Sequence, residues 1–266
     1  MAEFSKKLSI IIIPFRSVGH LERCVASIYK KLGDSFSWEI ILVNNDKDQN
    51  IISFPMDFSK IKLLDHKKNV GFGTGINLGA KLAEGEFLLI LNPDTEIITD
   101  NISKVFDEFS KDDKIGIIGG GILDRKNQNQ EWSAGKELSL YDLARNNLGV
   151  SRSESIWNSS RKTECDWVAG TVMFIKKDLF EKLGGFDEKF FMYFEDMDLC
   201  RRVRQLGKKI IFFPEFKIFH GSGESYEDKR LQKKHYYDSM EKYFQKNHGW
   251  LSWIIVKIFR KCLCKK

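Results

Sequence analysis

The sequence LSIIIIPF, residues 8–15, places a continuous apolar run of β-branched side chains directly before a proline. Such a run is typical of a strand that is buried on both faces of a parallel sheet. It is too short to be a membrane span or the apolar core of a signal peptide. We therefore expect these residues to form the first strand of a parallel sheet.

Short apolar stretches and helical stretches alternate after this run in units of about thirty residues, which is typical of a doubly wound parallel sheet. A polar segment at residues 124–165 interrupts the alternation, and we expect loops there. The fold class is therefore predicted to be α/β with a mostly parallel central sheet. The expected strands are 40–43, 61–64, 86–91, 115–118, 168–176, 210–213 and 216–219, and the expected helices are 21–32, 75–82, 102–109 and 179–183.

Composition is that of an ordinary globular protein, with 42% hydrophobic and 30% charged residues and a net charge of +6 over 266 residues. Nothing in this moderate charge indicates a nucleic-acid partner. The five cysteines lack the spacing of a zinc site or a redox pair, which favours reduced thiols in the cytosol. We expect one domain at residues 1–225 and a basic helical tail at residues 226–266.

Polar clusters follow four of the expected strands. Ligands bind open α/β sheets at the carboxyl ends of the strands, so the four clusters together predict a binding site on one rim. Each cluster taken alone would also suit a turn. The clusters are Pro14-Phe15-Arg16, Asn44-Asn45-Asp46, Asn69-Val70-Gly71 and Asn92-Pro93-Asp94-Thr95.

A glycine-rich stretch, GFGTG at residues 71–75, opens one of the expected helices. Backbone this free of side chains can approach a phosphate closely. The alternative is that the glycines allow a helix to pack tightly on a strand. The stretch does not match GxGxxG and follows the third strand instead of the first, so it does not favour a dehydrogenase.

The sequence FFMYFEDMDL, residues 190–199, places two adjacent carboxylates, Glu195 and Asp196, directly after an aromatic run. Carboxylates beside an apolar wall are partly desolvated, while backbone N–H groups at a helix start can reach them. This is the environment of a catalytic base. The alternative is that both acids only cap the helix that follows.

Read together, several segments resemble family 2 glycosyltransferases, in particular the rhamnosyltransferases of bacterial surface-polysaccharide assembly. The resemblance implies a GT-A fold and an inverting transfer of a sugar from a nucleotide donor. It covers residues 8 to about 225, without the polar middle segment. The segments that carry it are SIIIPFRSVGHLERCVASI, EIILVNND, NVGFGTGINLGAKLAEGEFLLILNPDTEI and WVAGTVMFIKKDLFEKLGGFDEKFFMYFEDMDLCRRVRQLGKKIIFFPEFKIFHGSGES.

The resemblance also implies chemical roles for individual residues. Asp94 corresponds to the acid of a DxD motif that holds Mg²⁺ or Mn²⁺ on the donor diphosphate. His220 corresponds to a position that supplies a further metal ligand in some relatives; the alternative is an ordinary surface or hydrogen-bonded histidine. Asn92 stands at the first acidic position of that motif, which leaves Asp94 as its only carboxylate. Asp196 corresponds to the general base, and Glu195 would orient it or contact the acceptor.

The remaining implied roles concern substrate binding. The residues expected beside the nucleotide sugar are Pro14, Phe15, Arg16, Asn44, Asn45, Asn69, Gly71, Gly73, Asn77 and Asn92, where Asn44 replaces an aspartate common in the family. Those expected on the acceptor side are Trp167, Gly170 and Thr171. Trp167 has a flat face that suits a sugar ring, although core packing would explain it equally well.

The last residues, 250–266, are amphipathic if helical. Tryptophans and a basic polar side are typical of a helix that lies in a membrane interface, and the segment is too short and too charged to span. The alternative is a helix docked on its own domain or on a dimer partner. The predicted apolar face consists of Leu251, Ile254, Ile255, Ile258 and Phe259, with Lys257, Lys261 and Lys265 largely opposite.

The sequence thus predicts a cytoplasmic glycosyltransferase, peripheral at the inner face of the cell membrane. The resemblance implies a nucleotide-sugar donor, with dTDP-rhamnose as the leading candidate, and a glycan or lipid-linked saccharide as acceptor. The alternatives are a non-catalytic sugar-nucleotide-binding protein of the same fold and a nucleotidyltransferase. A binding protein would not need the acid pair Asp94 and Asp196, and a nucleotidyltransferase would need glycines after the first strand. Oligomeric state remains open.

Overall fold

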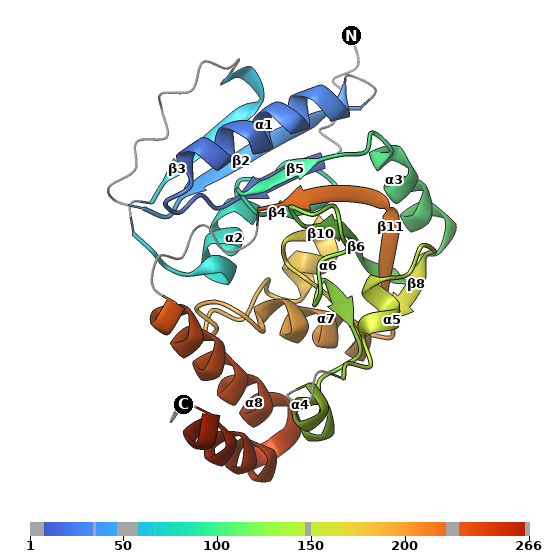
Figure 1. Ribbon diagram of the computed structural model, residues 1–266. Helices are drawn as coiled ribbons and strands as arrows, with labels where there is room; N and C mark the ends of the chain where they lie inside the picture. The colour runs from blue at the N-terminus through green and yellow to red at the C-terminus, as the bar shows by residue number, and fades with distance from the viewer. Residues whose placement is uncertain are drawn as a thin grey trace.

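The computed structural model describes residues 8–33, 36–46, 58–66, 68–146, 150–221 and 229–263 (Figure 1). A central sheet with the strand order β3-β2-β1-β4-β10-β6-β11-β5 forms its core, and β8 pairs with β11. The strands are β1 (Leu8–Ile12), β2 (Trp38–Asn44), β3 (Ile61–Asp65), β4 (Phe87–Leu91), β5 (Thr95–Ile97), β6 (Ile115–Leu123), β8 (Thr163–Cys165), β10 (Val172–Lys176) and β11 (Lys209–His220).

Strand β1 occupies the middle of a parallel run, as its apolar sequence predicts. Ile10 lies opposite Ile40 on β2 and Leu89 on β4, both in parallel register. Alternate residues of β1 enter different cores: Ile10 faces one side of the sheet and Ile11 the other, and both are fully buried. β6 and β11 are also parallel, whereas β10, β5 and β8 are antiparallel to their neighbours. The mostly parallel α/β sheet is therefore confirmed.

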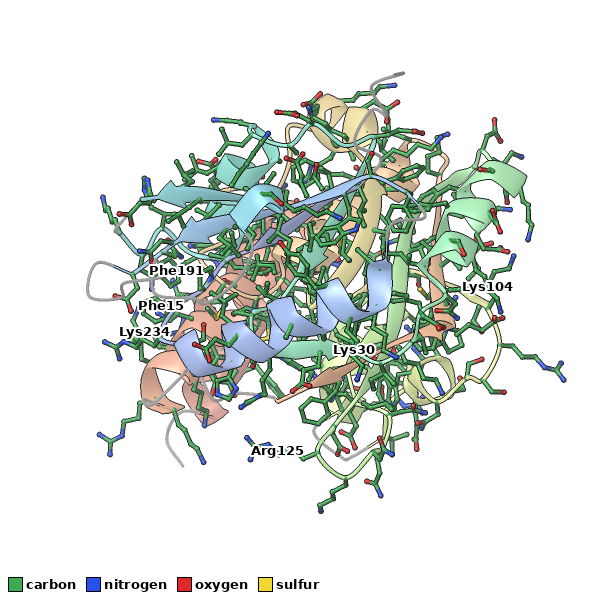
Figure 2. The ribbon with its side chains drawn as sticks, turned by 90° about the horizontal axis from the view of Figure 1, so that it is seen from above. Phe15, Lys30, Lys104, Arg125, Phe191 and Lys234 are labelled. Atoms are coloured by element: carbon green, nitrogen blue, oxygen red, sulfur yellow. The ribbon has the colours of Figure 1, made fainter. Side chains whose placement is uncertain are left out.

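Helices cover both faces of the sheet. Buried side chains of α1 and α3 pack on one face, and those of α2, α6, α7 and α8 pack on the other. Lys30 on α1 and Lys104 on α3 are exposed to solvent (Figure 2). The helices are α1 (Val18–Leu32), the short 3-10 helix η2 (Phe58–Lys60), α2 (Phe72–Ala80), α3 (Ile102–Lys111), α4 (Leu140–Asn146), α5 (Glu154–Trp157), α6 (Lys177–Lys182), α7 (Glu195–Gln205) and α8 (Lys229–Leu263).

Three expected strands differ from the prediction. The expected strand at 168–176 is broken after Val168: β9 (Trp167–Val168) pairs with β7 (Ala134–Gly135) in a small separate sheet, and β10 begins at Val172. Conversely, the expected strands at 210–213 and 216–219 form the single strand β11. Its register with β6 shifts between Phe213 and Lys217, because Pro214 has no N–H with which to continue the ladder.

The glycine-rich stretch is itself helical, since α2 begins at Phe72 and not at the expected Gly75. The polar segment at 124–165 is more regular than predicted, because it contains β7, α4, α5 and β8. Its short elements reach from the sheet toward the carboxyl-terminal helix (Figure 1). The segment thereby forms a wall beside the rim where the strands end.

Helix α8 folds back on itself. Gly249 adopts φ 82°, and Arg260 Nη1 lies 2.8 Å from both Asp238 Oδ1 and Glu241 Oε1. In a straight helix Asp238 and Arg260 would be roughly 33 Å apart. Tyr243 in the first half and Val256 in the second are buried in the domain core. The expected boundary between domain and tail, at 225/226, lies outside the described residues.

Candidate active site

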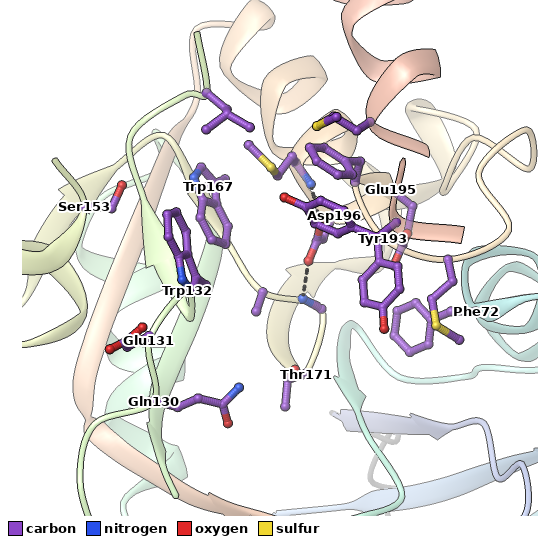
Figure 3. A pocket seen from close by; sticks show the side chains of 18 of the residues that line it. Phe72, Gln130, Glu131, Trp132, Ser153, Trp167, Thr171, Tyr193, Glu195 and Asp196 are labelled. Carbon is purple, nitrogen blue, oxygen red and sulfur yellow. Dashed lines mark hydrogen bonds between the residues drawn. The ribbon is translucent and has the colours of Figure 1, made fainter. Parts of the chain in front are cut away.

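A cavity of about 810 Å³ lies between the rim of the sheet, the segment 130–153 and helices α7 and α8. This volume is in the range of small-molecule sites. The cavity brings together residues that are far apart in the sequence: Asp94, Glu195, Asp196 and His220 all line it. Figure 3 shows Glu195, Asp196 and Tyr193 on one side and Trp132 and Trp167 on the other.

The acid pair is held at the start of α7 by an unusual backbone turn. Tyr193 and Phe194 have φ of 68° and 66°, a left-handed conformation that is costly for aromatic residues and frequent at functional sites. α8 holds this turn in place: the Gln232 amide donates to the Tyr193 hydroxyl at 2.9 Å, and the Ser239 hydroxyl donates to the Met192 carbonyl at 2.7 Å. The helix therefore begins at Glu195 with its acids at the cavity.

Asp196 receives two backbone hydrogen bonds. The Gly170 N–H donates to its Oδ2 at 3.0 Å (Figure 3), and the Met197 N–H donates to its Oδ1 at 2.8 Å. Burial raises the pKa of Asp196, and these hydrogen bonds only partly offset the effect. The result is a carboxylate that is fixed in orientation and more basic than an ordinary aspartate. Such a group suits proton abstraction.

Glu195 is buried, with 5% of its surface exposed, and its Oε2 has no hydrogen-bond partner among the described residues. Burial raises the pKa of Glu195 well above its ordinary value, and the neighbouring charge of Asp196 raises it further. The pair thus tends to hold a proton on Glu195 and to leave Asp196 as the member that ionises first. Capping of α7 does not fully explain Glu195, because its buried Oε2 accepts no hydrogen bond from the described residues.

Asp94 and His220 meet at the opposite end of the cavity, where β5 and β11 pair. His220 Nε2 lies 3.3 Å from Asp94 Oδ1, and its Nδ1 lies 2.7 Å from Gln130 Oε1. Burial alone would raise the pKa of Asp94, but hydrogen bonding to His220 and its charge keep that pKa below the ordinary value. Asp94 therefore stays ionised, in contrast to Glu195.

Of the residues expected beside the donor, Phe15 and Asn92 line the cavity. Asn45 instead ties neighbouring loops together: its amide nitrogen donates to Asn69 Oδ1 at 3.2 Å, its Oδ1 accepts from the Val70 N–H at 3.0 Å, and its backbone N–H donates to the Pro14 carbonyl at 3.3 Å. Pro14, Asn45 and Asn69 themselves are not part of the cavity lining, although Phe15, next to Pro14, is.

Gly71 and Gly73 are required by close approach to other parts of the protein. A Cβ on Gly71 would lie 2.2 Å from the Phe191 carbonyl oxygen, and one on Gly73 would lie 2.9 Å from Phe186 Cβ. The Phe72 N–H donates to the same Phe191 oxygen at 2.9 Å. These glycines thus seat α2 against the aromatic turn that precedes the acid pair, which agrees with the packing alternative.

The other donor-side residues also lie outside the cavity lining. Asn77 binds the backbone of Phe186 through both atoms of its amide, at 2.9 and 2.8 Å, and Asn44 donates to Asp65 Oδ1 at 2.8 Å. Arg16, with φ 50°, has its guanidinium 5.4 Å from the Phe15 ring centre. Contacts of these residues with a donor stay a prediction.

The expected acceptor-side residues Trp167, Gly170 and Thr171 all line the cavity. Trp167 is 7% exposed, and its indole N–H donates to the Lys136 carbonyl at 2.9 Å. Its ring is thus fixed in the wall and has only an edge of surface available to a ligand. Gly170 explains the break between β9 and β10, because its N–H turns away from the sheet to Asp196.

Sequence reasoning missed the cavity residues in the polar segment, among them Gln130, Trp132, Lys136 and Arg152. Trp132 is the clearest of these: it is 42% exposed, has φ 61° and packs at 5.3 Å against Trp157. A lone tryptophan in the polar run QNQEWS was a signal of a binding surface that could have been noticed.

The sequence of this chain matches a known protein family. Residues 9–184 match the family described as Glycosyl transferase family 2. The chain belongs to family 2 of the glycosyltransferases. A stretch at residues 152–222 also matches the family described as the N-terminal domain of galactosyltransferase. The expected resemblance is therefore confirmed at the level of the family.

Individual relatives are distant. The chain is 23% identical over 249 residues to the N-acetylglucosaminyl-diphospho-decaprenol L-rhamnosyltransferase of Mycobacterium tuberculosis, covering 82% of this chain and 77% of that protein. It is 27% identical over 163 residues to the rhamnosyltransferase WbbL of Escherichia coli, covering 56% of this chain and 60% of that protein.

A solved structure supports the fold. The crystal structure of GalNAc-T7 with UDP, GalNAc and Mn²⁺ superposes with a TM-score of 0.64 at 17% identity. The superposition covers 84% of this chain but only 45% of that protein. The GT-A fold expected from the sequence is thereby confirmed. Within the described residues, no helix is at once long and apolar enough to cross a bilayer.

The raised pKa of Glu195 predicts a pH-dependent stability difference in Glu195→Gln. Below its ordinary pKa of 4.5 the carboxyl is protonated in the folded and unfolded states, so the variant and the wild type differ least there. As pH rises toward the folded-state pKa, only the unfolded wild type ionises. The free energy of unfolding of the variant should therefore rise relative to that of wild type, by about 1.4 kcal/mol for each pH unit in this range.

Urea unfolding at several values between pH 4.5 and pH 8, the lower limit being the ordinary pKa of Glu195, measures this difference. Glu86→Gln, which alters an exposed carboxylate, is the matched control and should show no comparable trend. A Glu195→Gln stability difference that does not change with pH would mean that the carboxyl is not held protonated by its surroundings.

Proposed function

We propose that this chain is an inverting glycosyltransferase in which Asp196 is the general base. The observation that carries the proposal is the shared cavity: an ionised acid beside a histidine, Asp94 with His220, and a partly buried, more basic carboxylate, Asp196, line the same space. Two acids in different environments suit two different tasks. A protein that only binds sugar nucleotides would have no use for the second acid.

In the proposed reaction Asp196 accepts the proton of an acceptor hydroxyl. The freed oxygen attacks the anomeric carbon of the donor sugar from the side opposite the nucleoside diphosphate, whose bond to that carbon breaks. The proton stays on Asp196, and its raised pKa favours that state. The N–H groups of Gly170 and Met197 hold the carboxylate in one orientation throughout, so little reorganisation is needed.

Asp94 and His220 would hold Mg²⁺ or Mn²⁺. A carboxylate oxygen and an imidazole nitrogen 3.3 Å apart are a partial ligand set, of the kind that donor phosphates complete. The Gln130 carbonyl at Nδ1 suits this role, because it fixes the ring with Nε2 toward Asp94. When bound, the metal would offset the negative charge that develops on the leaving diphosphate.

For the donor we propose dTDP-rhamnose, and for the acceptor a lipid-linked saccharide. The names of two relatives support this choice, since both are rhamnosyltransferases and one is named for a diphospho-decaprenol saccharide. The aromatic cavity walls would suit sugar rings. A nucleotidyltransferase is disfavoured by the family to which the chain belongs.

The second half of α8 would contact a membrane surface. Its outer side presents a continuous apolar stripe to solvent, in which Ile255 is 51% and Ile258 is 59% exposed. Phe259, expected on this face, instead lines the cavity. Exposed Lys257 and Lys261 flank the stripe and would favour an anionic surface. The stripe consists of Trp250, Leu251, Ile254, Ile255 and Ile258.

The assigned base is tested by Asp196→Asn. The amide keeps the size of the side chain but cannot take up a proton, so turnover should fall by about 10²–10⁴-fold while donor binding changes little. Transfer is measured with a panel of sugar nucleotides, and donor binding by calorimetry. Asp107→Asn, on the exposed side of α3, is the control. Turnover of Asp196→Asn comparable to wild type would refute the assignment.

The metal site is tested by Asp94→Asn. The substitution removes the charge that would attract the ion, so affinity for dTDP in the presence of Mn²⁺ should fall about tenfold or more, whereas affinity in EDTA should stay as in wild type. Asp100→Asn, an exposed neighbour, controls for a general change in charge. If Mn²⁺ strengthened dTDP binding equally in the variant, Asp94 would not be a ligand.

Membrane contact is tested by the double variant Ile255→Glu and Ile258→Glu. Two charges in the stripe should reduce co-sedimentation with vesicles that contain anionic phospholipid about tenfold or more, because each glutamate opposes insertion. Leu206→Glu, at a residue 46% exposed on another face, is the matched control. Equal sedimentation of the double variant and wild type would argue against the stripe as the contact.

A further inference from the structure

The cavity extends well beyond the two acids that the proposed reaction uses. Gln130, which contacts His220, and Ser153 lie at opposite ends of one wall, with Glu131 and Trp132 between them (Figure 3). The metal-binding end is therefore at Gln130. The other end, near Ser153, belongs to the polar segment in which the sequence showed no family motif.

Two cationic side chains line this second end. Lys136 is exposed and belongs to the lining of the cavity, and its ammonium group has no hydrogen-bond or ion-pair partner among the described residues. Its backbone is nevertheless fixed, because its N–H donates to Ser153 Oγ at 3.0 Å and its carbonyl accepts from Trp167 at 2.9 Å. A well-placed cation without a partner inside a cavity calls for an anionic ligand.

Arg152 is the second cation, and it is oriented by an acid. Its Nε and Nη2 donate to the two carboxylate oxygens of Asp142 at 2.5 and 2.7 Å. This bidentate pair fixes the guanidinium plane while its Nη1 group has no partner among the described residues. Asp142 itself is held by Ser139, whose N–H donates to Oδ2 at 3.0 Å. Arg152 thus presents free N–H groups in a set direction.

Apolar side chains continue the cavity past these cations. Leu138 and Leu143 come from the polar segment, and Met240 and Phe259 come from the two halves of α8. Phe259 lies on the same helical segment whose outer side forms the exposed apolar stripe. The lining of the cavity therefore includes, besides the acids and the two cations, an apolar part next to the helix that carries the stripe.

We propose that Lys136 and Arg152 bind the diphosphate of a lipid-linked acceptor, with the start of the lipid chain against the apolar end. The inference rests on the proposed function. It adds which part of the cavity binds the diphosphate and the lipid of the acceptor. Two adjacent cations, one a planar fork and one a point charge, match the oxygens of a diphosphate. In the proposed function the donor diphosphate binds beside Asp94. Lys136 and Arg152 are therefore available for a different ligand.

The sugar of such an acceptor would lie between the cations and the metal-binding end. Trp167 lies between the two groups. Its indole N–H donates to the Lys136 carbonyl, and three residues later along the chain the Gly170 N–H donates to Asp196. Trp132 offers its exposed face on the same wall. A sugar seated here would have a hydroxyl facing Asp196 while its diphosphate reached Lys136 and Arg152.

The test uses the full chain in metal-free buffer with farnesyl diphosphate as the probe, measured by calorimetry. Lys136→Met and Arg152→Gln should each weaken binding about tenfold, the loss expected for one charge-assisted contact. Lys30→Met, at an exposed site on α1, should bind as wild type does. Inorganic pyrophosphate should bind more weakly than the farnesyl ester, because it makes no apolar contact.

Two results would overturn the proposal. One is farnesyl diphosphate binding that neither cavity variant weakens. The other is binding that dTDP competes away, which would place the probe in the donor site. Lys136→Met breaks no side-chain hydrogen bond among the described residues, so misfolding does not explain its effect. Arg152→Lys keeps the charge and should therefore recover part of the affinity for farnesyl diphosphate that Arg152→Gln loses.

The outcome is separable from that of the proposed function. Transfer to a water-soluble sugar acceptor without a diphosphate tests the proposed function by itself, because wild type should be active and Asp196→Asn should not. If soluble transfer occurs but the cations do not affect farnesyl diphosphate binding, only the diphosphate site is refuted. If no sugar nucleotide supports transfer, the proposed function fails instead.

Discussion

The hydrogen bond from the Gly170 N–H to the Asp196 carboxylate joins the two halves of the site. Gly170 lies between β9, in the small sheet, and β10, in the central sheet. The hydrogen bond connects this crossing point with the first turn of α7. In an uninterrupted strand this N–H would instead be hydrogen-bonded to the neighbouring strand of the sheet. The break thus leaves the Gly170 N–H free to donate to Asp196, and this bond ties the start of α7 to the sheet rim.

Burial around this bond has a cost that the rest of the protein offsets. Glu195 and Asp196 are both more difficult to ionise than exposed acids, and the turn before them is held in a left-handed conformation. Asp198, in the same helix turn, is fully buried but paired with Arg202 at 2.8 Å and Lys246 at 2.7 Å. Such pairing anchors α7 to α8 and keeps the strained turn closed.

Much of the fold follows from local sequence. The run at residues 8–13 could be identified as a buried strand, because a strand covered on both faces consists almost entirely of apolar residues. The two acids at 94 and 196 were found because each follows a strand or opens a helix within a specific motif. These signals depend on neighbours in the chain, so a single sequence contains them.

The parts that were missed depend on distant contacts. The break at Gly170 is determined by a residue 26 positions later, and β11 passes Pro214 because β6 continues beside it. The polar segment has no periodicity, since its side chains pack against loops and α8 instead of a single regular face. Lys136 and Arg152 therefore looked like ordinary surface charges, and only the cavity relates them to the acids.

The reversal of α8 at Gly249 gives one short helix two duties. Its inward side closes the cavity through Phe259, and its outward side is the apolar stripe. A shortened protein that ends before this segment would thus lose a piece of the substrate chamber together with any affinity for lipid. Loss of activity in such a truncated protein would therefore not distinguish an altered cavity from loss of the proposed lipid contact.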